Sequence, residues 1–492
     1  MEVFSWLLVL SIILYYFGKR GRPKDFPPGP RPLPFIANIF LLAFQRGFLN
    51  PLKQFQKLSK QYGPVFSLYS GRKPMVFIQD WRLAKEVLLT KGIEFADRQT
   101  NPIFEVINKK KGIIMAPYGQ AWKEQRRFSL MVLRNFGLGK KSMEERILAE
   151  ATYLIQALTE NMRAPFEPFC FTDRAVSNII SSIVFGKRFE YEDATLRNVL
   201  DLLHLNLKLS SGPWALVYND APLLRRLPLP HKTIFENAEK IFAFLTKELD
   251  EHKATFVPGE HRDFIDAYLD EMQKSEKKGL SFDDENLLIV VSDLFIAGSE
   301  TTARTLQWGL LYMMAYPEIQ EKCQQEMDAV LGNNVCLKYE DRERLPYTNA
   351  VIHEILRFSS VVPLGVEHAP IKDMMLSRYI IPKGTAMMIN LHSIHHDESL
   401  WKSPNKFDPS HFLNEEGEFV KPEAFLAFSA GPRVCLGENL ARMELFLFFT
   451  SMLRNFQVSW PDESSVPDCT PQFHGVLAPL PFKVSLRQRQ QK

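Results

Sequence analysis

The chain has 492 residues, of which 46% are hydrophobic and 24% are charged, the ordinary balance of a globular protein. This length allows two or three average domains, or one large catalytic domain whose core has room for a cofactor. The net charge of +3 gives no indication of a nucleic-acid partner. The 5 cysteines are widely spaced, with no C-x-x-C pair, zinc spacing or disulfide framework, which favours a reducing compartment.

Residues 1–20 are predicted to form a transmembrane signal-anchor. An almost unbroken apolar run extends from Val3 to Phe17, and basic residues follow at 19–24. With Met1 included, the helix would span roughly 25 Å, a little short for an average bilayer but tolerable in the endoplasmic reticulum membrane. A cleaved signal peptide is the main alternative, but Glu2 precedes the run and the basic cluster follows it. Because positive residues stay on the cytoplasmic side, we expect the catalytic domain in the cytosol.

Residues 21–34 are basic and proline-rich, and they are predicted to form a hinge. The run from Pro27 to Pro34 reads Pro-Pro-Gly-Pro-Arg-Pro-Leu-Pro. Such a segment is stiff and extended, so it can hold the catalytic body at a set distance from the membrane, with a generic linker as the alternative. Residues 35–492 show no further linker or repeat and are predicted to form one catalytic domain.

The pattern over 35–492 predicts a mainly α protein with smaller β-sheets, in the α+β class. The longest predicted helix runs from Phe282 to Ala315, with Ser281 as its N-cap and Pro317 marking its end. Its apolar middle is typical of a buried helix. Short β-like segments are predicted at Val65–Tyr69, Met75–Ile78 and Met387–Leu391.

A polar interruption, Ala297-Gly298-Ser299-Glu300-Thr301-Thr302, lies inside that helix. A helical glycine costs about 1 kcal/mol against alanine, and a carboxylate is a poor choice for a core. Functional sites tend to break such rules. A threonine can bond back to a carbonyl one turn earlier, opening the helix and leaving room for water. A helix bend with a satisfied polar pair is the alternative.

The stretch from Phe428 to Gly437, FSAGPRVCLG, is the most informative in the chain and fits the pattern F-x-x-G-x-R-x-C-x-G. Its glycines allow a tight loop that exposes the sulfur of Cys435. A predicted helix, 438–453, follows, and its free N–H groups and dipole favour an ionised sulfur; Arg433 adds a cation. A buried structural cysteine is the alternative, which five matched positions outweigh.

This loop resembles the haem-binding loop of the cytochrome P-450 monooxygenases, which hold iron through a cysteine thiolate. The resemblance covers about Pro27 to Val484 and is most like microsomal family two, near its J subfamily. It implies the cytochrome P-450 fold and haem b (iron protoporphyrin IX) with Cys435 as the axial iron ligand. The same resemblance implies cofactor-binding roles for four further loop residues, Phe428, Gly431, Arg433 and Gly437.

By the same resemblance, Glu300 and Thr301 form an acid–alcohol pair that delivers protons to dioxygen. Ala297 and Gly298 would leave space there for dioxygen and substrate. Thr301 and Glu300 are therefore the candidate catalytic residues.

The resemblance also implies a structural network that supports the haem-binding region. Its first members are Glu354 and Arg357, an i, i+3 pair that alone is weak evidence. The family completes this network with a basic side chain from a later segment, Phe407 to Phe412. Here that residue is His411, where much of the superfamily has arginine.

The haem propionates are expected to contact Trp122 and Arg126, which lie four residues apart on one helical face. Arg98 and His368 match further propionate contacts of family two. Glu367 departs from the family, which usually has proline at this position, so the shape of the loop and the role of His368 are open.

The substrate pocket of the family maps onto mostly apolar positions, each of which core packing would also explain. These positions are Ile103, Phe104, Ile113, Ile114, Phe295, Ala297, Val362, Leu364 and Val476.

The implied activity is insertion of one oxygen atom from O2 into lipophilic substrates: polyunsaturated fatty acids such as arachidonic acid, xenobiotics or steroids. Electrons would come from NADPH through cytochrome P-450 reductase, with cytochrome b5 as a further candidate. Basic residues suit docking of an acidic donor, although a solvated charged face is their default interpretation. They are Lys123, Arg127, Arg134, Lys140, Lys141 and Arg442.

Two other functions are alternatives. A haem-thiolate isomerase or dehydratase would need no proton relay, so the Glu300–Thr301 pair argues against it. A non-catalytic haem-binding membrane protein would bind haem without turnover.

Overall fold

The computed structural model describes residues 11, 22–31, 51–70, 73–99, 101–136, 141–275, 281–332, 336–462 and 464–489. The predicted anchor, apart from residue 11, and the two ends of the hinge lie outside these residues. Among the described helices, none is long and apolar enough to cross a membrane.

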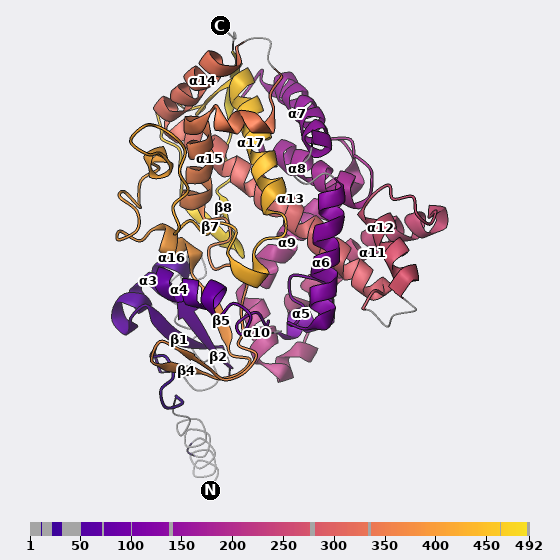
Figure 1. Cartoon of the computed structure of the whole chain (residues 1–492), viewed down its shortest axis with the longest axis vertical. Helices are drawn as coiled ribbons and strands as arrows, with labels where there is room; N and C mark the ends of the chain where they lie inside the picture. The colour runs from indigo at the N-terminus through magenta and orange to yellow at the C-terminus, as the bar shows by residue number, and fades with distance from the viewer. Residues whose placement is uncertain are drawn as a thin grey trace.

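Helix α13 (Asp284–Ala315) runs through the middle of the molecule. It packs against α8 (Phe169–Val184), α15 (Pro346–Ser359) and α17 (Glu438–Asn455), as Figure 1 shows. Such a helix is surrounded by protein, which is why its sequence is apolar on nearly every side.

The ends of α13 test the predicted caps. The prediction of Ser281 as N-cap is wrong, because Asp283 caps the helix and accepts a hydrogen bond from the backbone N–H of Asn286 at 2.7 Å. The predicted end is confirmed. Helix α13 ends at Ala315, and Pro317 is the first residue of α14 (Pro317–Leu331).

The remaining helices surround this core. They are α3 (Pro51–Tyr62), α4 (Trp81–Lys85), α5 (Pro102–Asn108), α6 (Gln120–Asn135), α7 (Lys141–Asn161), α9 (Ala194–Ser210), α10 (Pro213–Asp220), α11 (His231–Thr255), α12 (Phe264–Ser275) and α16 (Leu391–His395). Shorter turns are the π-helix η1 (Glu86–Thr90) and the 3-10 helices η2 (Pro222–Arg226), η4 (Tyr339–Glu343), η5 (Pro409–Phe412) and η6 (Gly431–Arg433).

A three-stranded sheet lies at one end of the molecule (Figure 1). Strand β1 (Val65–Ser70) runs antiparallel to β2 (Lys73–Ile78), which pairs in parallel with β5 (Ala386–Ile389). The strand predicted to reach residue 391 ends at 389, because Asn390 caps α16. Three two-stranded sheets pair β3 (Met374–Leu376) with β4 (Tyr379–Ile381), β6 (Phe456–Ser459) with β9 (Ser485–Gln488), and β7 (Pro471–His474) with β8 (Val476–Pro479). The predicted mainly α fold with small sheets is confirmed.

The described part of the hinge lies along β1. The backbone N–H of Ser67 donates to the carbonyl of Pro28 at 2.7 Å, and its hydroxyl donates to the carbonyl of Pro27 at 2.8 Å. A Cβ on Gly29 would lie 2.0 Å from the Ser67 carbonyl oxygen. These contacts fix the path of the chain as it enters the catalytic body.

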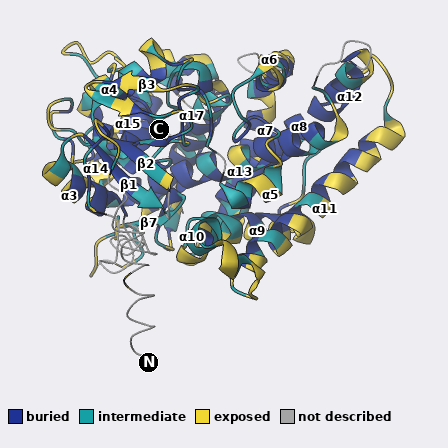
Figure 2. Ribbon diagram, turned by 90° about the horizontal axis from the view of Figure 1, so that it is seen from below, coloured by how far each residue is buried: buried dark blue, intermediate teal, exposed yellow. Residues whose placement is uncertain are grey.

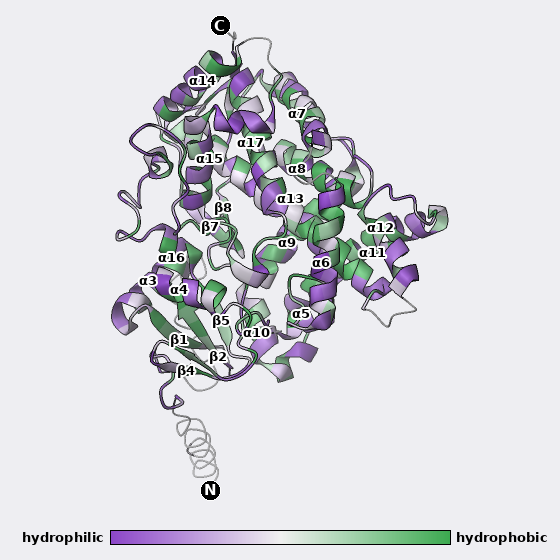
Figure 3. Cartoon of the chain, in the orientation of Figure 1, coloured by the Kyte–Doolittle hydropathy of each residue, from purple (hydrophilic) through white to green (hydrophobic). Residues whose placement is uncertain are grey.

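Burial and hydropathy differ between the outer and the inner elements of the fold. Figure 2 shows the outer face of α11 exposed, while its inner face is buried against the core. In Figure 3, β1 and β2 are mainly hydrophobic and α14 is mainly hydrophilic. The cavity described next is bordered by two buried helices, α13 and α17.

Candidate active site

A cavity lies between the middle of α13 and the loop that carries Cys435. Helix α13 is buried along most of its length, yet Ala297 is exposed and Gly298 and Thr301 are partly exposed. All three residues line the cavity, and so does Cys435. The cavity is therefore internal space that side chains from both elements border but do not fill.

The Cys435 loop owes its path to Gly431. Its φ is +75°, in the left-handed region that favours glycine, and a Cβ there would lie 1.8 Å from the Leu88 carbonyl oxygen. The loop therefore packs directly on the backbone of η1. Gly437 is different: its φ is −95°, and no atom lies within 4 Å of where its Cβ would be. Gly437 is one of the residues that line the cavity.

Burial raises the pKa of the Cys435 thiol. The backbone N–H of Gly437 at the start of α17 lowers it, as predicted, and so does the charge of Arg126, but the surrounding protein and the charge of Glu438 outweigh both. The Cys435 side chain itself is exposed towards the cavity, as the sequence predicted. The expected ionised sulfur is therefore not a property of the protein alone. A metal ion bound to the sulfur would deprotonate it.

Three guanidinium groups, from Arg98, Arg126 and Arg433, line the same cavity. Within the described parts of the chain, none of them forms an ion pair with a carboxylate. Burial, joined by the charge of Arg126 and opposed by that of Glu367, lowers the pKa of Arg98 to about 10. Burial and the charges of Arg98 and Arg126 together lower the pKa of Arg433 to about 8. Buried cations need counter-charges. A haem carries two propionates and takes a thiolate ligand, so this set of side chains fits a haem.

Arg433 and Trp122 brace the cavity wall. The Arg433 guanidinium donates hydrogen bonds to three carbonyls in the segment 96–116, at 2.7 to 3.1 Å, and lies 4.0 Å from the Trp122 ring. The Trp122 indole N–H donates to the carbonyl of Ile113 at 3.1 Å. Trp122 is not among the residues that line the cavity, so it supports Arg433 and Arg126 from behind.

Arg98 and His368 meet through a short β-bridge. Asp97 and Ala369 exchange two backbone hydrogen bonds, of 3.1 and 2.8 Å. Nδ1 of His368 donates to the carbonyl of Phe95 at 3.0 Å, because a carbonyl can only accept. Burial lowers the pKa of His368 to about 3, helped by the charge of Arg98. The imidazole is therefore neutral, with Nε2 as an acceptor.

Glu367, which stands where the family usually has proline, does not move His368 away from the cavity. Its carbonyl accepts a hydrogen bond from Arg98, and His368 still lines the cavity. Burial raises the pKa of the Glu367 carboxyl to about 7, although the charges of Arg98 and Lys73 lower it.

Comparison with known proteins decides the family. The family model described as Cytochrome P450 matches residues 27–486. The chain belongs to the cytochrome P450 family. It is 47% identical to cytochrome P450 2J2 of Homo sapiens over 452 residues, which cover 92% of this chain and 89% of that relative. It is 45% identical to cytochrome P450 2J1 of Oryctolagus cuniculus, covering 93% and 90%. It is 42% identical to cytochrome P450 2D10 of Mus musculus, covering 100% and 97%.

These relatives confirm the prediction of a family 2 cytochrome P450, with J-type and D-type relatives at similar identity. The protein is therefore a P450 monooxygenase, and its cofactor is a haem held by a thiolate. Of the chain's cysteines, Cys435 is the one that lines the cavity.

The polar segment of α13 divides between two sides of the helix. The cavity between α13 and the Cys435 loop is called the P450 cavity below. The Thr301 hydroxyl faces it and donates to the carbonyl of Ala297 at 3.0 Å. A Cβ on Gly298 would lie 2.8 Å from Ile180 of α8. The glycine therefore lets two helices approach. It also lines the P450 cavity, and the expectation that it leaves space for dioxygen stays a prediction.

Glu300 faces away from the P450 cavity. Its carboxylate pairs with Nε2 of His204 at 2.7 Å and with Nε of Arg304 at 2.8 Å, and it lines a second cavity. The two members of the predicted acid–alcohol pair thus lie on different sides of α13, and their catalytic roles stay predictions.

The expected substrate-pocket residues also divide. Four line the P450 cavity, namely Ile113, Ile114, Ala297 and Val362. Five do not border it, namely Ile103, Phe104, Phe295, Leu364 and Val476. Phe295 packs in the core against Phe185 and Phe244, and Val476 lines the second cavity. The sequence could not separate these groups, because both are apolar.

Two acidic residues of the cavity wall were missed by the sequence analysis. Glu444 of α17 is 2% exposed, and burial raises its pKa well above the ordinary range despite a hydrogen bond from Thr302. Asp293 of α13 accepts the backbone N–H groups of Ile113 and Ile114 at 2.7 and 2.9 Å. The signal was an acid at an otherwise buried helical position, the same signal that singled out Glu300.

The three residues of the predicted structural network, Glu354, Arg357 and His411, lie together in the structure. Glu354 and Arg357, both 0% exposed, form a two-bonded ion pair at 2.7 Å. Nδ1 of His411 lies 3.3 Å from both Glu354 carboxylate oxygens. Arg357 also donates to the carbonyls of Pro404 and Lys406, so the network ties α15 to the segment that precedes the Cys435 loop.

Proposed function

We propose that this P450 hydroxylates or epoxidises lipophilic substrates with one oxygen atom from O2, taking polyunsaturated fatty acids such as arachidonic acid, xenobiotics or steroids. The observation that carries the proposal is the composition of the cavity wall beside Thr301. Apolar side chains dominate there, including Ile113, Ile114, Leu294, Val361 and Val362. A wall of this kind binds apolar ligands and excludes water.

Different residues of the chain would bind the haem and position the proton donor. The haem, when bound, supplies the oxygen chemistry, and electron donation from the sulfur favours O–O cleavage. Cys435 would hold the iron, and Arg98, Arg126 and Arg433 would neutralise the propionates. The Thr301 hydroxyl stands at the cavity wall, where it can hold a proton donor next to dioxygen. Helix α13 fixes the position of that hydroxyl.

Electrons would come from NADPH through the flavin-containing reductase, with cytochrome b5 as a second donor. Three exposed cations of α6, Lys123, Arg127 and Arg134, support docking of an acidic partner. Lys141, at the start of α7, is also exposed, and Lys140 lies outside the described residues.

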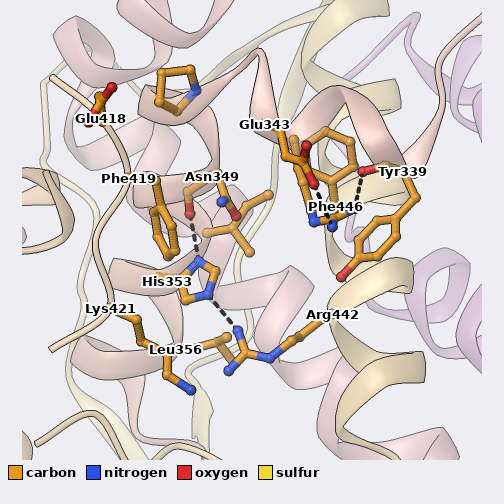
Figure 4. A pocket seen from close by; sticks show the side chains of 13 residues that line it. Tyr339, Glu343, Asn349, His353, Leu356, Glu418, Phe419, Lys421, Arg442 and Phe446 are labelled. Atoms are coloured by element: carbon orange, nitrogen blue, oxygen red, sulfur yellow. Dashed lines mark hydrogen bonds and ion pairs between the residues drawn. The ribbon is translucent and has the colours of Figure 1, made fainter. Parts of the chain in front are cut away.

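Two further basic residues are Arg442, which is partly exposed, and Lys421, which is exposed. They border a surface pocket of about 530 Å³ (Figure 4). Arg442 donates to Glu438 at 2.8 Å and contacts His353, and its guanidinium lies 4.9 Å from the ring of Phe428 in the Cys435 loop. A partner bound here would lie close to the haem ligand.

The proposed location is the endoplasmic reticulum membrane, with the catalytic domain in the cytosol. Deletion of residues 1–17 should loosen membrane attachment and leave the haem spectrum intact. Full retention of the truncated chain in the membrane fraction, even after a high-salt wash, would argue against the anchor.

The test of the function is product profiling. The full chain would be reconstituted with reductase and supplied with NADPH, O2 and a panel of fatty acids, steroids and drugs. Oxygenated products that depend on both NADPH and reductase are expected. Peroxide rearrangement without reductase would favour the isomerase alternative, and haem binding without any product would favour the non-catalytic alternative.

A further inference from the structure

The surface pocket of about 530 Å³ lies among η4, α15, the segment 418–421 and α17, and Figure 4 shows it from close by. Concave sites of about 300–1,000 Å³ are the size that small-molecule ligands occupy. Among the described residues, Leu356 is the one that lines both this pocket and the P450 cavity. The pocket is therefore a separate space that borders the haem site at a single side chain.

One end of the pocket carries two cations beside a neutral histidine. Nδ1 of His353 donates to the carbonyl of Asn349 at 2.8 Å, and Nε2 accepts from the Arg442 guanidinium. Burial and the charges of Arg442 and Lys421 together lower the pKa of His353 to about 3, although the bond to Asn349 opposes them. The positive charge at this end therefore belongs to Arg442 and Lys421, which Figure 4 shows near His353.

Lys421 forms no ion pair with an acid in the described parts of the chain. The other two cations of the pocket do, because Arg342 pairs with Glu343 at 3.1 Å and Arg442 pairs with Glu438 at 2.8 Å. Lys421 is also exposed, so its ammonium group is accessible from solvent. An anion bound in the pocket would meet a cation that no described carboxylate already neutralises.

Arg442 also keeps N–H groups for a ligand. Its Nε and Nη2 each donate to Oε1 of Glu438, at 2.9 and 2.8 Å, and its Nη1 donates to His353. A guanidinium has five N–H groups, so two of them have no partner among the described residues. Carboxylate oxygens form strong, charge-assisted hydrogen bonds with such groups.

The rest of the wall is mainly uncharged. The Phe419 ring lies 4.4 Å from the His353 ring, centroid to centroid, so the apolar wall begins beside the charged end. The uncharged side chains of the wall are Tyr339, Pro346, Ile352, Leu356, Phe419 and Phe446. An occupant that suits both parts of the pocket has a negatively charged head and an apolar body.

Two acids on the same wall, Glu343 and Glu418, limit the charge of the occupant. A ligand with several phosphate groups would be repelled by these carboxylates, because like charges placed together are costly. A ligand with a single carboxylate matches the single cation, Lys421, that lacks an acidic partner among the described residues.

We propose that this pocket binds a small amphipathic carboxylate. Its head would lie between Lys421 and Arg442, and its apolar body would lie against Phe419, Ile352 and Leu356. This ligand is not placed as a substrate, because it lies outside the P450 cavity.

A bound carboxylate would nevertheless touch side chains that adjoin the haem site. Leu356 separates the pocket from the P450 cavity, and the Arg442 guanidinium lies 4.9 Å from the Phe428 ring. The carbonyl of Phe428 accepts the backbone N–H of Cys435 at 3.0 Å. The ligand is thus one side chain away from the loop that holds the sulfur.

The first test locates the ligand and requires no turnover. The holoenzyme would be saturated with an azole that ligates the haem iron and fills the P450 cavity. It would then be irradiated with the photoreactive carboxylate 4-benzoylbenzoate, and cross-linked peptides mapped by mass spectrometry. We expect cross-links within residues 339–356 and 418–446, and a severalfold lower yield with the uncharged analogue 4-benzoylbenzamide. Cross-links confined to other segments, or equal yields with acid and amide, would overturn the proposal.

The second test measures the affinity of the azole-saturated holoenzyme for 4-benzoylbenzoate by equilibrium dialysis in the dark. Lys421→Glu reverses the charge at an exposed position, so the affinity should fall by at least about 10-fold. Lys57→Glu, on α3 and outside the pocket, makes the same change in net charge and should bind as the wild type does. Equal affinities for the two variants would overturn the proposal. Neither test depends on product formation, so their outcome is independent of the proposed monooxygenase function.

Discussion

The Thr301 hydroxyl donates a hydrogen bond of 3.0 Å to the carbonyl of Ala297, and both residues face the P450 cavity. The bond holds the hydroxyl oxygen at a fixed point on the wall, with lone pairs free to accept from water. Thr301→Ala removes this oxygen without changing the helix. We expect haem to stay bound, while product formation falls by about 10²-fold, the lower end of the range for positioned proton transfer. NADPH consumption should continue, with peroxide as the product.

Thr301→Ser is the matched control, because it keeps the hydroxyl, and its coupling should stay close to that of the wild type. Peroxide yield and NADPH consumption would be measured together. Unchanged coupling in Thr301→Ala would remove Thr301 from the proton path.

Two glycines of the Cys435 loop should respond differently to the same substitution. Gly431→Ala forces a left-handed φ of +75° on alanine and places its Cβ against the Leu88 carbonyl. We expect a loss of at least 1–3 kcal/mol of stability, on the order of the strain at such positions, and loss of haem. Gly437→Ala meets no protein atom, so the thermal midpoint of the apoprotein should hold while haem affinity falls. Equal midpoints for both apoprotein variants would contradict the described packing.

The Glu354–Arg357 pair should be far more sensitive than exposed pairs. Glu354→Gln leaves a guanidinium buried without a counter-charge, which costs about 3–5 kcal/mol. Glu343→Gln breaks an exposed pair with Arg342, of 3.1 Å, and should cost no more than about 1 kcal/mol. Thermal unfolding of the two variants would be compared. Similar small losses in both would show that the buried network is not needed for stability.

Glu367 should make the protein less stable as pH rises. Its folded pKa of about 7 lies above its ordinary value, so the folded state holds a proton that the unfolded state has lost between about pH 4.5 and 7. Stability therefore falls across that window. Glu367→Gln should match the wild type near pH 5 and exceed it at pH 8, by on the order of 1–3 kcal/mol.

The control for this comparison is Glu416→Gln, at an exposed position, which should show no pH-dependent gain. Thermal midpoints at the two pH values supply the measurement. A Glu367→Gln advantage that is equal at pH 5 and pH 8 would mean that burial of the carboxyl is not the cause.

The sequence predicted the fold well where a single rule governs a segment. Pro317 cannot continue α13, and the loop around Cys435 can close only with glycine at 431, so both features could be read directly. The N-cap was harder, because Ser281 and Asp283 are both good caps, and only the packing of α6 and α13 selects Asp283.

The site was predicted less completely, because facing directions depend on tertiary packing. Glu300 and Thr301 are neighbours in the sequence, yet they border different cavities. Phe295 and Ala297 are both apolar, and only tertiary packing places Phe295 in the core, against Phe185 and Phe244, and Ala297 at the cavity. Glu444 matched no motif considered, although an acid in the apolar helix 438–455 was a usable signal.

The absorption spectrum of the purified full chain, reduced and exposed to carbon monoxide, tests the central claim most directly. The account predicts the red-shifted Soret band of a thiolate-ligated haem, and loss of that band in Cys435→Ala. A spectrum of the histidine-ligated type, or a thiolate-type band that survives in Cys435→Ala, would contradict it.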